Sequence, residues 1–148
     1  MNESVRGQLA RLREAATTGA VAQLCQRHDV DLFVVFGSVL TETSDTQDLD
    51  VAIRLGSRTQ RHDPLTILDD LYRLTGSERI DLMVLNRAAP LARERALTTG
   101  EPLFQGKAGD FANAQIAAIM ERLDTDQFRA LDLELIADPL TRLRPDTA

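Results

Sequence analysis

The order of apolar and polar residues along the chain predicts helices and strands that alternate. Residues 4–28 carry apolar side chains at helical spacing, with an interruption at residues 17–19. Residues 31–36 are a short run rich in β-branched and aromatic side chains, which predicts a buried strand. Over residues 48–55 apolar and polar residues alternate, which predicts a second strand with its apolar side chains on one face. The polar face of that strand would hold Asp48, Asp50, Ala52 and Arg54.

The second half of the chain repeats this alternation. Asp63 and Pro64 are typical of a helix start and Gly76 of a helix end. The predicted apolar stripe of this helix is Leu65, Leu68, Leu71 and Tyr72. The later elements are predicted as a strand over 79–85, a helix from Pro90 with Gly100 as its C′ residue, a strand over 102–105 and a long helix from Asp110.

This alternation predicts an α/β fold in which a small, mixed β-sheet is flanked by helices. A chain of 148 residues fits one domain. A domain of this size buries roughly 70% of the surface that its unfolded chain exposes, so it needs no disulfide or structural metal to be stable. We therefore expect residues 1–148 to form a single domain, with a helical C-terminal segment over about 109–137. The lone cysteine, Cys25, is expected in the core.

Charge and hydropathy narrow the class of protein. The formal net charge of −6 argues against a general nucleic-acid binder, which presents a basic surface. The longest apolar run is far too short to span a membrane, and the N-terminus lacks a signal-peptide pattern. We expect a cytoplasmic protein that binds neither membrane nor nucleic acid directly.

The first candidate for chemistry is Gly37-Ser38, directly after the predicted buried strand. Glycine lets the backbone turn sharply and approach a ligand closely. If a helical turn begins here, its first amides are unpaired and partly positive, which suits a phosphate, and the Ser38 hydroxyl adds a donor. The alternative interpretation is an ordinary turn.

The second candidate is the pair Asp48 and Asp50. Two carboxylates one residue apart on a strand project from the same face, roughly 6–7 Å apart along the chain. Neighbouring anions repel, so one takes a proton unless a cation lies between them, and Mg²⁺ is the hard cation that prefers such oxygen ligands. The alternative interpretation is a solvated strand edge.

The third candidate is Asp81, in an otherwise apolar strand. A buried carboxylate without a partner is costly, so Asp81 lies either at the rim of the sheet or beside a metal. Together, a phosphate-binding turn and three carboxylates would suit a two-metal site for phosphoryl transfer, in which the protein supplies mainly position and charge.

These residues resemble the signature of the polymerase-beta-like nucleotidyltransferase superfamily: Gly37-Ser38, nine residues, then Asp48-Leu49-Asp50. Within it the chain looks most like the minimal nucleotidyltransferase (MntA-type) antitoxins. They share the strand over residues 80–86, Ile-Asp-Leu-Met-Val-Leu-Asn, and the stretch over 95–104. The resemblance covers about residues 31–105.

The resemblance implies a role for each matched residue. Gly37 and Ser38 would hold the triphosphate of ATP, Asp48 and Asp50 would bind Mg²⁺, and Asp81 would complete a second metal site and help activate the acceptor hydroxyl. It also implies a partner, a HEPN-domain (HepT) ribonuclease toxin held in a hetero-oligomer. The antitoxin would inactivate this toxin by transferring AMP from ATP to a hydroxyl of the toxin, that of a tyrosine side chain.

One departure from the family pattern concerns the phosphates. The family often continues after Gly-Ser with a small residue and Arg-Gly, whereas this chain has Thr41 and Glu42. The lost arginine and added carboxylate should weaken triphosphate binding unless another cation compensates. Candidate cations, each also interpretable as a plain surface arginine, are Arg54, Arg58, Arg61 and Arg87.

Two other functions remain open. Because the arginine is missing, one alternative is an antitoxin that neutralises its toxin by binding alone. A protein that only binds would have no need of Asp48, Asp50 and Asp81. A small-molecule nucleotidyltransferase of the aminoglycoside-modifying type is the other alternative, but such enzymes usually add a helical domain for which this chain has little room.

Overall fold

The computed structural model describes residues 4–41 and 48–137, except the side chains of residues 125 and 127–137. Glu42, one of the two residues that stand in place of the family's Arg-Gly, lies outside these residues. The helices and strands are α1 (Val5–Thr18), α2 (Ala20–Arg27), β1 (Val30–Phe36), η1 (Ser38–Leu40), β2 (Leu49–Leu55), α3 (Pro64–Thr75), β3 (Ile80–Val84), η2 (Leu85–Arg87), α4 (Pro90–Thr99), β4 (Glu101–Gln105) and α5 (Asp110–Ala137).

The four strands form one mixed sheet in the order β3-β2-β1-β4. β1 pairs antiparallel with both β2 and β4, whereas β2 and β3 run parallel. The predicted fold class is confirmed. Because β1 ends where β2 and β3 begin, the turn after β1 and the first residues of β2 and β3 share one edge of the sheet.

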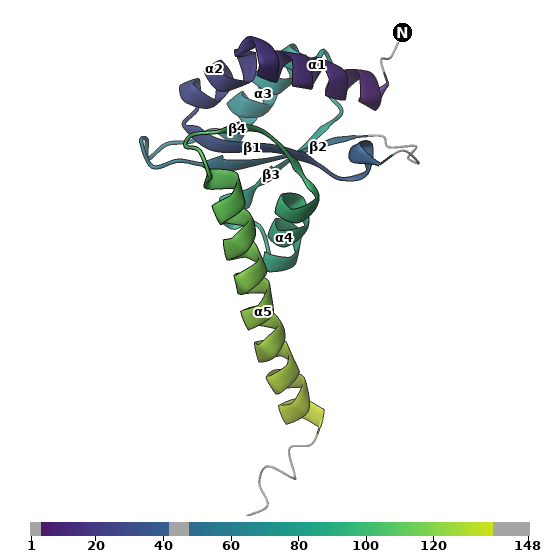
Figure 1. Ribbon diagram of the computed structural model, residues 1–148, viewed down its shortest axis with the longest axis vertical. Helices are drawn as coiled ribbons and strands as arrows, with labels where there is room; N and C mark the ends of the chain where they lie inside the picture. The colour runs from purple at the N-terminus through teal and green to yellow at the C-terminus, as the bar shows by residue number, and fades with distance from the viewer. Residues whose placement is uncertain (1–3, 42–47, 138–148) are drawn as a thin grey trace, which may run out of the picture.

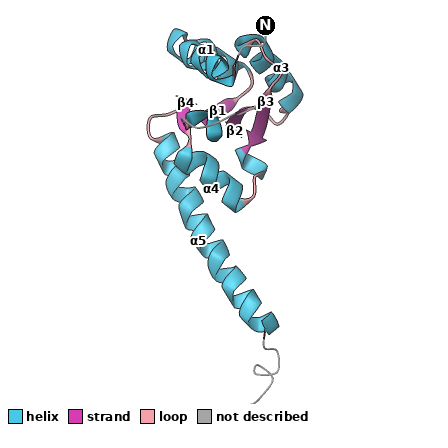
Figure 2. Cartoon of the chain, turned by 90° about the vertical axis from the view of Figure 1, so that its right-hand side faces the viewer, coloured by secondary structure: helices cyan, strands magenta, loops and turns pink. Residues whose placement is uncertain are grey.

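Helices cover both faces of the sheet (Figures 1 and 2). α1, α2 and α3 lie on one face, and the larger apolar cluster fills the space between them and the sheet. α4 and the start of α5 lie on the other face, over a smaller cluster that includes Leu32, Val34 and Ala52. Both faces of β1 are therefore buried, as its continuous apolar run predicts.

Local sequence signals place the starts of α1 and α3 correctly. Ser4 accepts a hydrogen bond from the Gly7 amide at the start of α1, and Asp63 accepts one from the Leu65 amide at the start of α3. The predicted interruption at residues 17–19 is Gly19, whose left-handed backbone separates α1 from α2. Cys25 is fully buried, and burial raises the pKa of its thiol to about 12.

Two predictions about helices are wrong in detail. Leu65 is exposed, because the stripe of α3 that packs on the sheet is centred on Ile67 and Leu71. Gly100 follows α4 with φ −82°, which is not left-handed. Glycine is required there because a Cβ would overlap the Ala96 carbonyl oxygen and a Val34 methyl group.

α5 has 28 residues and projects well beyond the rest of the molecule (Figure 1). Its first turns contact α4 and β4. In the described part of the chain, no helix is long and apolar enough to cross a membrane.

Candidate active site

The sheet topology brings the predicted site residues to one edge of the sheet. Gly37 follows the last residue of β1, and the register pairs Phe36 with Asp50 and Asp50 with Asp81. Paired residues on adjacent strands point to the same face, and adjacent strands lie about 4.8 Å apart. Asp48, two residues before Asp50, precedes β2 at the same edge. That face of the sheet is the one that carries α4 and α5.

Position 37 requires glycine for two reasons: its backbone conformation and its close contact with the Asp50 carboxylate. Its φ of +88° and ψ of −163° lie in a region that is essentially restricted to glycine. A Cβ on Gly37 would overlap Oδ2 of Asp50 and would stand 3.1 Å from its Cγ. The backbone of the turn therefore packs directly against the carboxylate, which fixes the position of one relative to the other.

The carboxylates at this edge repel one another. Asp50 is half-buried, whereas Asp48 and Asp81 are exposed. Burial, then the charges of Asp81 and Asp48, raise the pKa of the Asp50 carboxyl above its ordinary value. Within residues 4–41 and 48–137, no lysine or arginine forms an ion pair with any of the three.

The donor set fits a divalent cation, but the site is not a preformed metal centre. Among the described residues, no three histidine, cysteine, aspartate or glutamate side chains are grouped closely enough to hold a metal ion. Nonetheless, three carboxylates on one face are the hard oxygen donors that Mg²⁺ prefers, and a cation would relieve the repulsion that raises the pKa of Asp50. The carboxylates would converge on the ion as it binds.

The turn after Gly37 is closed by Thr41. The Ser38 carbonyl oxygen accepts hydrogen bonds from the Thr41 amide at 3.0 Å and from the Thr41 hydroxyl at 2.8 Å. The Thr41 carbonyl oxygen in turn accepts one from the guanidinium of Arg6, on α1, at 3.2 Å. Arg6 thus contacts the residue that stands where the family often has an arginine. Nothing in the sequence signals this, because the two residues are 35 positions apart.

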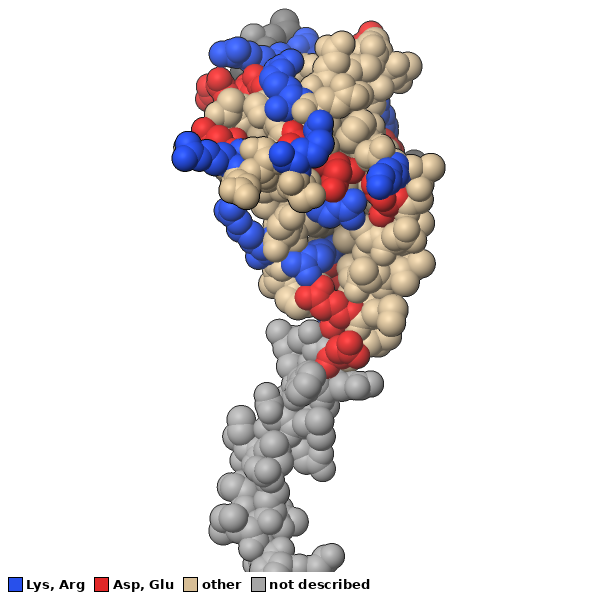
Figure 3. Space-filling view, turned by 90° about the vertical axis from the view of Figure 1, so that its left-hand side faces the viewer, with Lys and Arg blue, Asp and Glu red and all other residues tan. Residues whose placement is uncertain are grey.

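The arginines that sequence reasoning offered for the phosphates include two that are engaged elsewhere. Arg54 shares the face of Asp50 as predicted, but it lies near the other end of β2, where it pairs with Asp31 at 2.6 Å and with Asp110 at 3.6 Å. Arg58 pairs with Asp29 at 2.9 Å. Figure 3 shows basic and acidic side chains intermixed over this side of the molecule.

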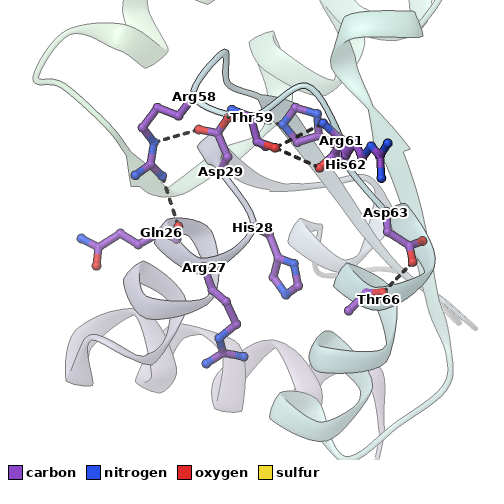
Figure 4. Close-up of a pocket in the computed structure, with 10 residues that line it drawn as sticks. All are labelled: Gln26, Arg27, His28, Asp29, Arg58, Thr59, Arg61, His62, Asp63 and Thr66. Atoms are coloured by element: carbon purple, nitrogen blue, oxygen red, sulfur yellow. Dashed lines mark hydrogen bonds and ion pairs between the residues drawn. The ribbon is translucent and has the colours of Figure 1, made fainter.

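A polar cavity of about 360 Å³ lies at that far end, before β1 and after β2 (Figure 4). The buried Asp29 accepts hydrogen bonds from the Thr59 amide, Arg58 and His62. Burial raises the pKa of the Asp29 carboxyl, but these donors outweigh it and hold the pKa below its ordinary value. The network ties the loop after β2 to the start of β1. It is structural, and it was not predicted from the sequence.

Comparison with known proteins agrees with this fold. A family model described as "Polymerase beta, Nucleotidyltransferase" matches residues 20–108. No curated protein matches the chain. Similar folds are found in a toxin–antitoxin crystal structure with AMP-PNP (TM-score 0.62, 18% identity, 79% of this chain and 95% of that one) and in an MntA–HepT complex (0.59, 16%, 80% and 95%). A third is the MNT antitoxin bound to a tri-AMPylated HEPN toxin of Shewanella oneidensis (0.61, 15%, 84% and 98%).

The identities to these solved structures, 15–18%, are low, so they speak for the fold alone. The family model matches more than half of the chain, including the glycine turn and all three carboxylates. The chain therefore belongs to the polymerase beta nucleotidyltransferase family.

Proposed function

We propose that this chain is a cytoplasmic antitoxin that transfers AMP from ATP to a tyrosine hydroxyl of a partner HEPN ribonuclease toxin and so inactivates it. The single observation that carries the proposal is the meeting of the Gly37 turn with Asp48, Asp50 and Asp81 at one sheet edge. The neighbours described as holding AMP-PNP or an AMPylated HEPN toxin support the choice of ATP and of this partner.

Each residue has a distinct part in the proposed reaction. The amides of the turn after Gly37, with the Ser38 hydroxyl, bind the triphosphate. Asp48, Asp50 and Asp81 would hold two Mg²⁺ ions, which neutralise the charge that develops on the attacking and leaving oxygens. The tight packing of Gly37 on Asp50 holds phosphate-binding backbone and metal-binding carboxylate in fixed relation, which is the positioning that phosphoryl transfer needs.

The bonds that form and break are those of nucleotidyl transfer. The acceptor oxygen forms a bond to the α-phosphorus, the bond from that phosphorus to the bridging oxygen of pyrophosphate breaks, and pyrophosphate leaves. The hydroxyl proton passes to the carboxylate of Asp81, which is exposed and adjacent to Asp50 on the next strand. An exposed base suits a large acceptor, because the hydroxyl of a protein can reach it.

The alternative of a binding-only antitoxin is supported by one observation. Thr41, in place of the usual arginine, uses its side chain to close the turn rather than to bind phosphate. Transfer and binding are distinguished by one assay. The small-molecule alternative has no specific feature of the structure in its favour.

The test is transfer of label from ATP to the product of the neighbouring gene, which the proposal expects to be a HEPN protein. We expect label from α-³²P-ATP, and none from γ-³²P-ATP, on the HEPN protein in the presence of Mg²⁺. Asp48→Asn with Asp50→Asn should abolish labelling. Asp69→Asn, which changes an exposed aspartate on α3, should leave labelling unchanged. No label, with silencing of the toxin by an intact complex, would replace transfer by binding alone.

A further inference from the structure

The outer face of α5 carries an apolar stripe that the described part of the molecule leaves uncovered. Four large side chains are about half exposed: Ile116 (57%), Ile119 (40%), Met120 (61%) and Leu123 (57%). Their spacing of three, four and seven residues puts them on one side of the helix. A continuous exposed apolar stripe of this kind marks an interaction surface.

The stripe points away from the rest of the domain. α5 packs against α4 through the opposite side of the helix, where Ala118 is buried and where Arg93 pairs with Glu121 and Glu94 with Arg122. At 100° per residue, Ala118 lies about 200° around the helix from Ile116. The stripe is therefore not a poorly packed part of the core, because it faces away from α4 and the sheet.

Charge argues against a second copy of this chain as the occupant. The exposed Asp124 and Asp126 border the stripe near Leu123. Arg122 pairs with Asp126 but also with Glu94, so the charges beside the stripe remain acidic on balance. Two copies with a net charge of −6 each would bring like charges together.

We propose that this surface, defined as Ile116, Ile119, Met120 and Leu123 with the acidic rim Asp124 and Asp126, is the docking surface for the toxin. The matching partner surface is an apolar groove bordered by lysine or arginine, into which α5 inserts one face of its helix. A ribonuclease must neutralise RNA phosphates with basic side chains, so a basic border is the chemistry that such a partner offers. The identity of the partner rests on the proposed function.

Docking on α5 is compatible with transfer at Asp50. α5 extends from the face of the sheet that carries the carboxylates. A helix is about 10–12 Å across, so a partner that binds its outer side can extend around it to the sheet edge. Binding and chemistry then use separate residues, and variants can remove one without the other.

The experiment measures affinity of the purified full-length chain for the purified HEPN protein by calorimetry. The test variant is Ile116→Gln with Met120→Gln, because glutamine keeps the helix propensity while it removes apolar surface. Leu65→Gln is the matched control, since Leu65 is 77% exposed on the other face of the sheet. We expect affinity to fall at least tenfold in the test variant and to stay unchanged in the control.

Kinetics separate this inference from the proposed function. The test variant should raise the KM for the toxin and keep the kcat, whereas Asp50→Asn should bind normally and transfer nothing. Unchanged affinity of the test variant, or no binding by the wild type, would overturn the docking surface. Self-association of the wild type that the test variant abolishes would also overturn it, in favour of a second copy. Absence of transfer with binding intact would overturn only the proposed chemistry.

Discussion

Substituting Gly37 by alanine should cost stability and, far more, activity. The backbone at Gly37 lies in the glycine-only region at positive φ and extended ψ, where a side chain costs of order 1–3 kcal/mol. The added Cβ also overlaps Oδ2 of Asp50, and such overpacking typically costs a further ~1–3 kcal/mol. Against this, alanine reduces the entropy of the unfolded chain by about 0.4–1 kcal/mol. The net loss should be about 2–3 kcal/mol, a fall in Tm of roughly 4–12 °C for a chain of this size.

The matched control is Gly19→Ala. Gly19 also has a positive φ, of 93°, but an added Cβ there meets nothing within 4 Å, and its ψ of −1° is in the more accessible left-handed region. We expect a loss of about 1 kcal/mol and normal transfer. In Gly37→Ala the displaced Asp50 carboxylate should cut transfer about 100-fold, since an error of an ångström costs that much. Equal stability and equal transfer of the two variants would refute the packing of the turn on Asp50.

Three further predictions follow from charge. Folding raises the pKa of the Asp50 carboxyl, so its protonation favours the folded state. This contribution to the free energy of unfolding is present in full below the ordinary pKa of 3.8 and is lost as pH rises through the folded pKa. Asp50→Asn should therefore raise Tm at pH 7, with no gain below about pH 4, and an unchanged Tm at pH 7 would contradict the repulsion. Asp29→Asn should lose about 1–3 kcal/mol in urea denaturation at pH 7, because it breaks the pair with Arg58. Since the folded pKa of Asp29 is lowered, this loss should shrink as pH falls below 3.8. Arg6→Ala should raise the KM for ATP by up to about fivefold, as expected for one exposed charge, with Arg73→Ala as a control that leaves the KM unchanged.

The strands and their faces could be predicted from the sequence because both faces of the sheet are buried. Alternation over residues 48–55 separates Leu49 and Val51 from Asp50, and a shift of one residue would put the aspartate into the larger core. The same constraint puts Asp81 and Asp50 on one face once β2 and β3 are paired. The candidate site could thus be assembled from three short motifs.

Features that depend on distant contacts could not be predicted. The contact of Arg6 with Thr41 joins α1 to the turn after β1, and the network around Asp29 joins the start of β1 to the loop after β2. Leu65 fitted a helical stripe in the sequence, yet the stripe that packs is set by how α3 lies on the sheet. For the same reason, the exposed face of α5 could not be distinguished from a core-facing one.

The two ends of the sheet differ in how acidic side chains are compensated, and this contrast is itself an argument for function. At the end with the polar cavity, Asp29, Asp31 and Asp70 each have arginine partners. At the other end, Asp48, Asp50 and Asp81 have none among the described residues. The chain has 17 basic residues, so a shortage of arginine does not explain the difference. Carboxylates without a cationic partner raise the free energy of the folded state, and such local costs are typical of sites that bind a cation and a charged substrate.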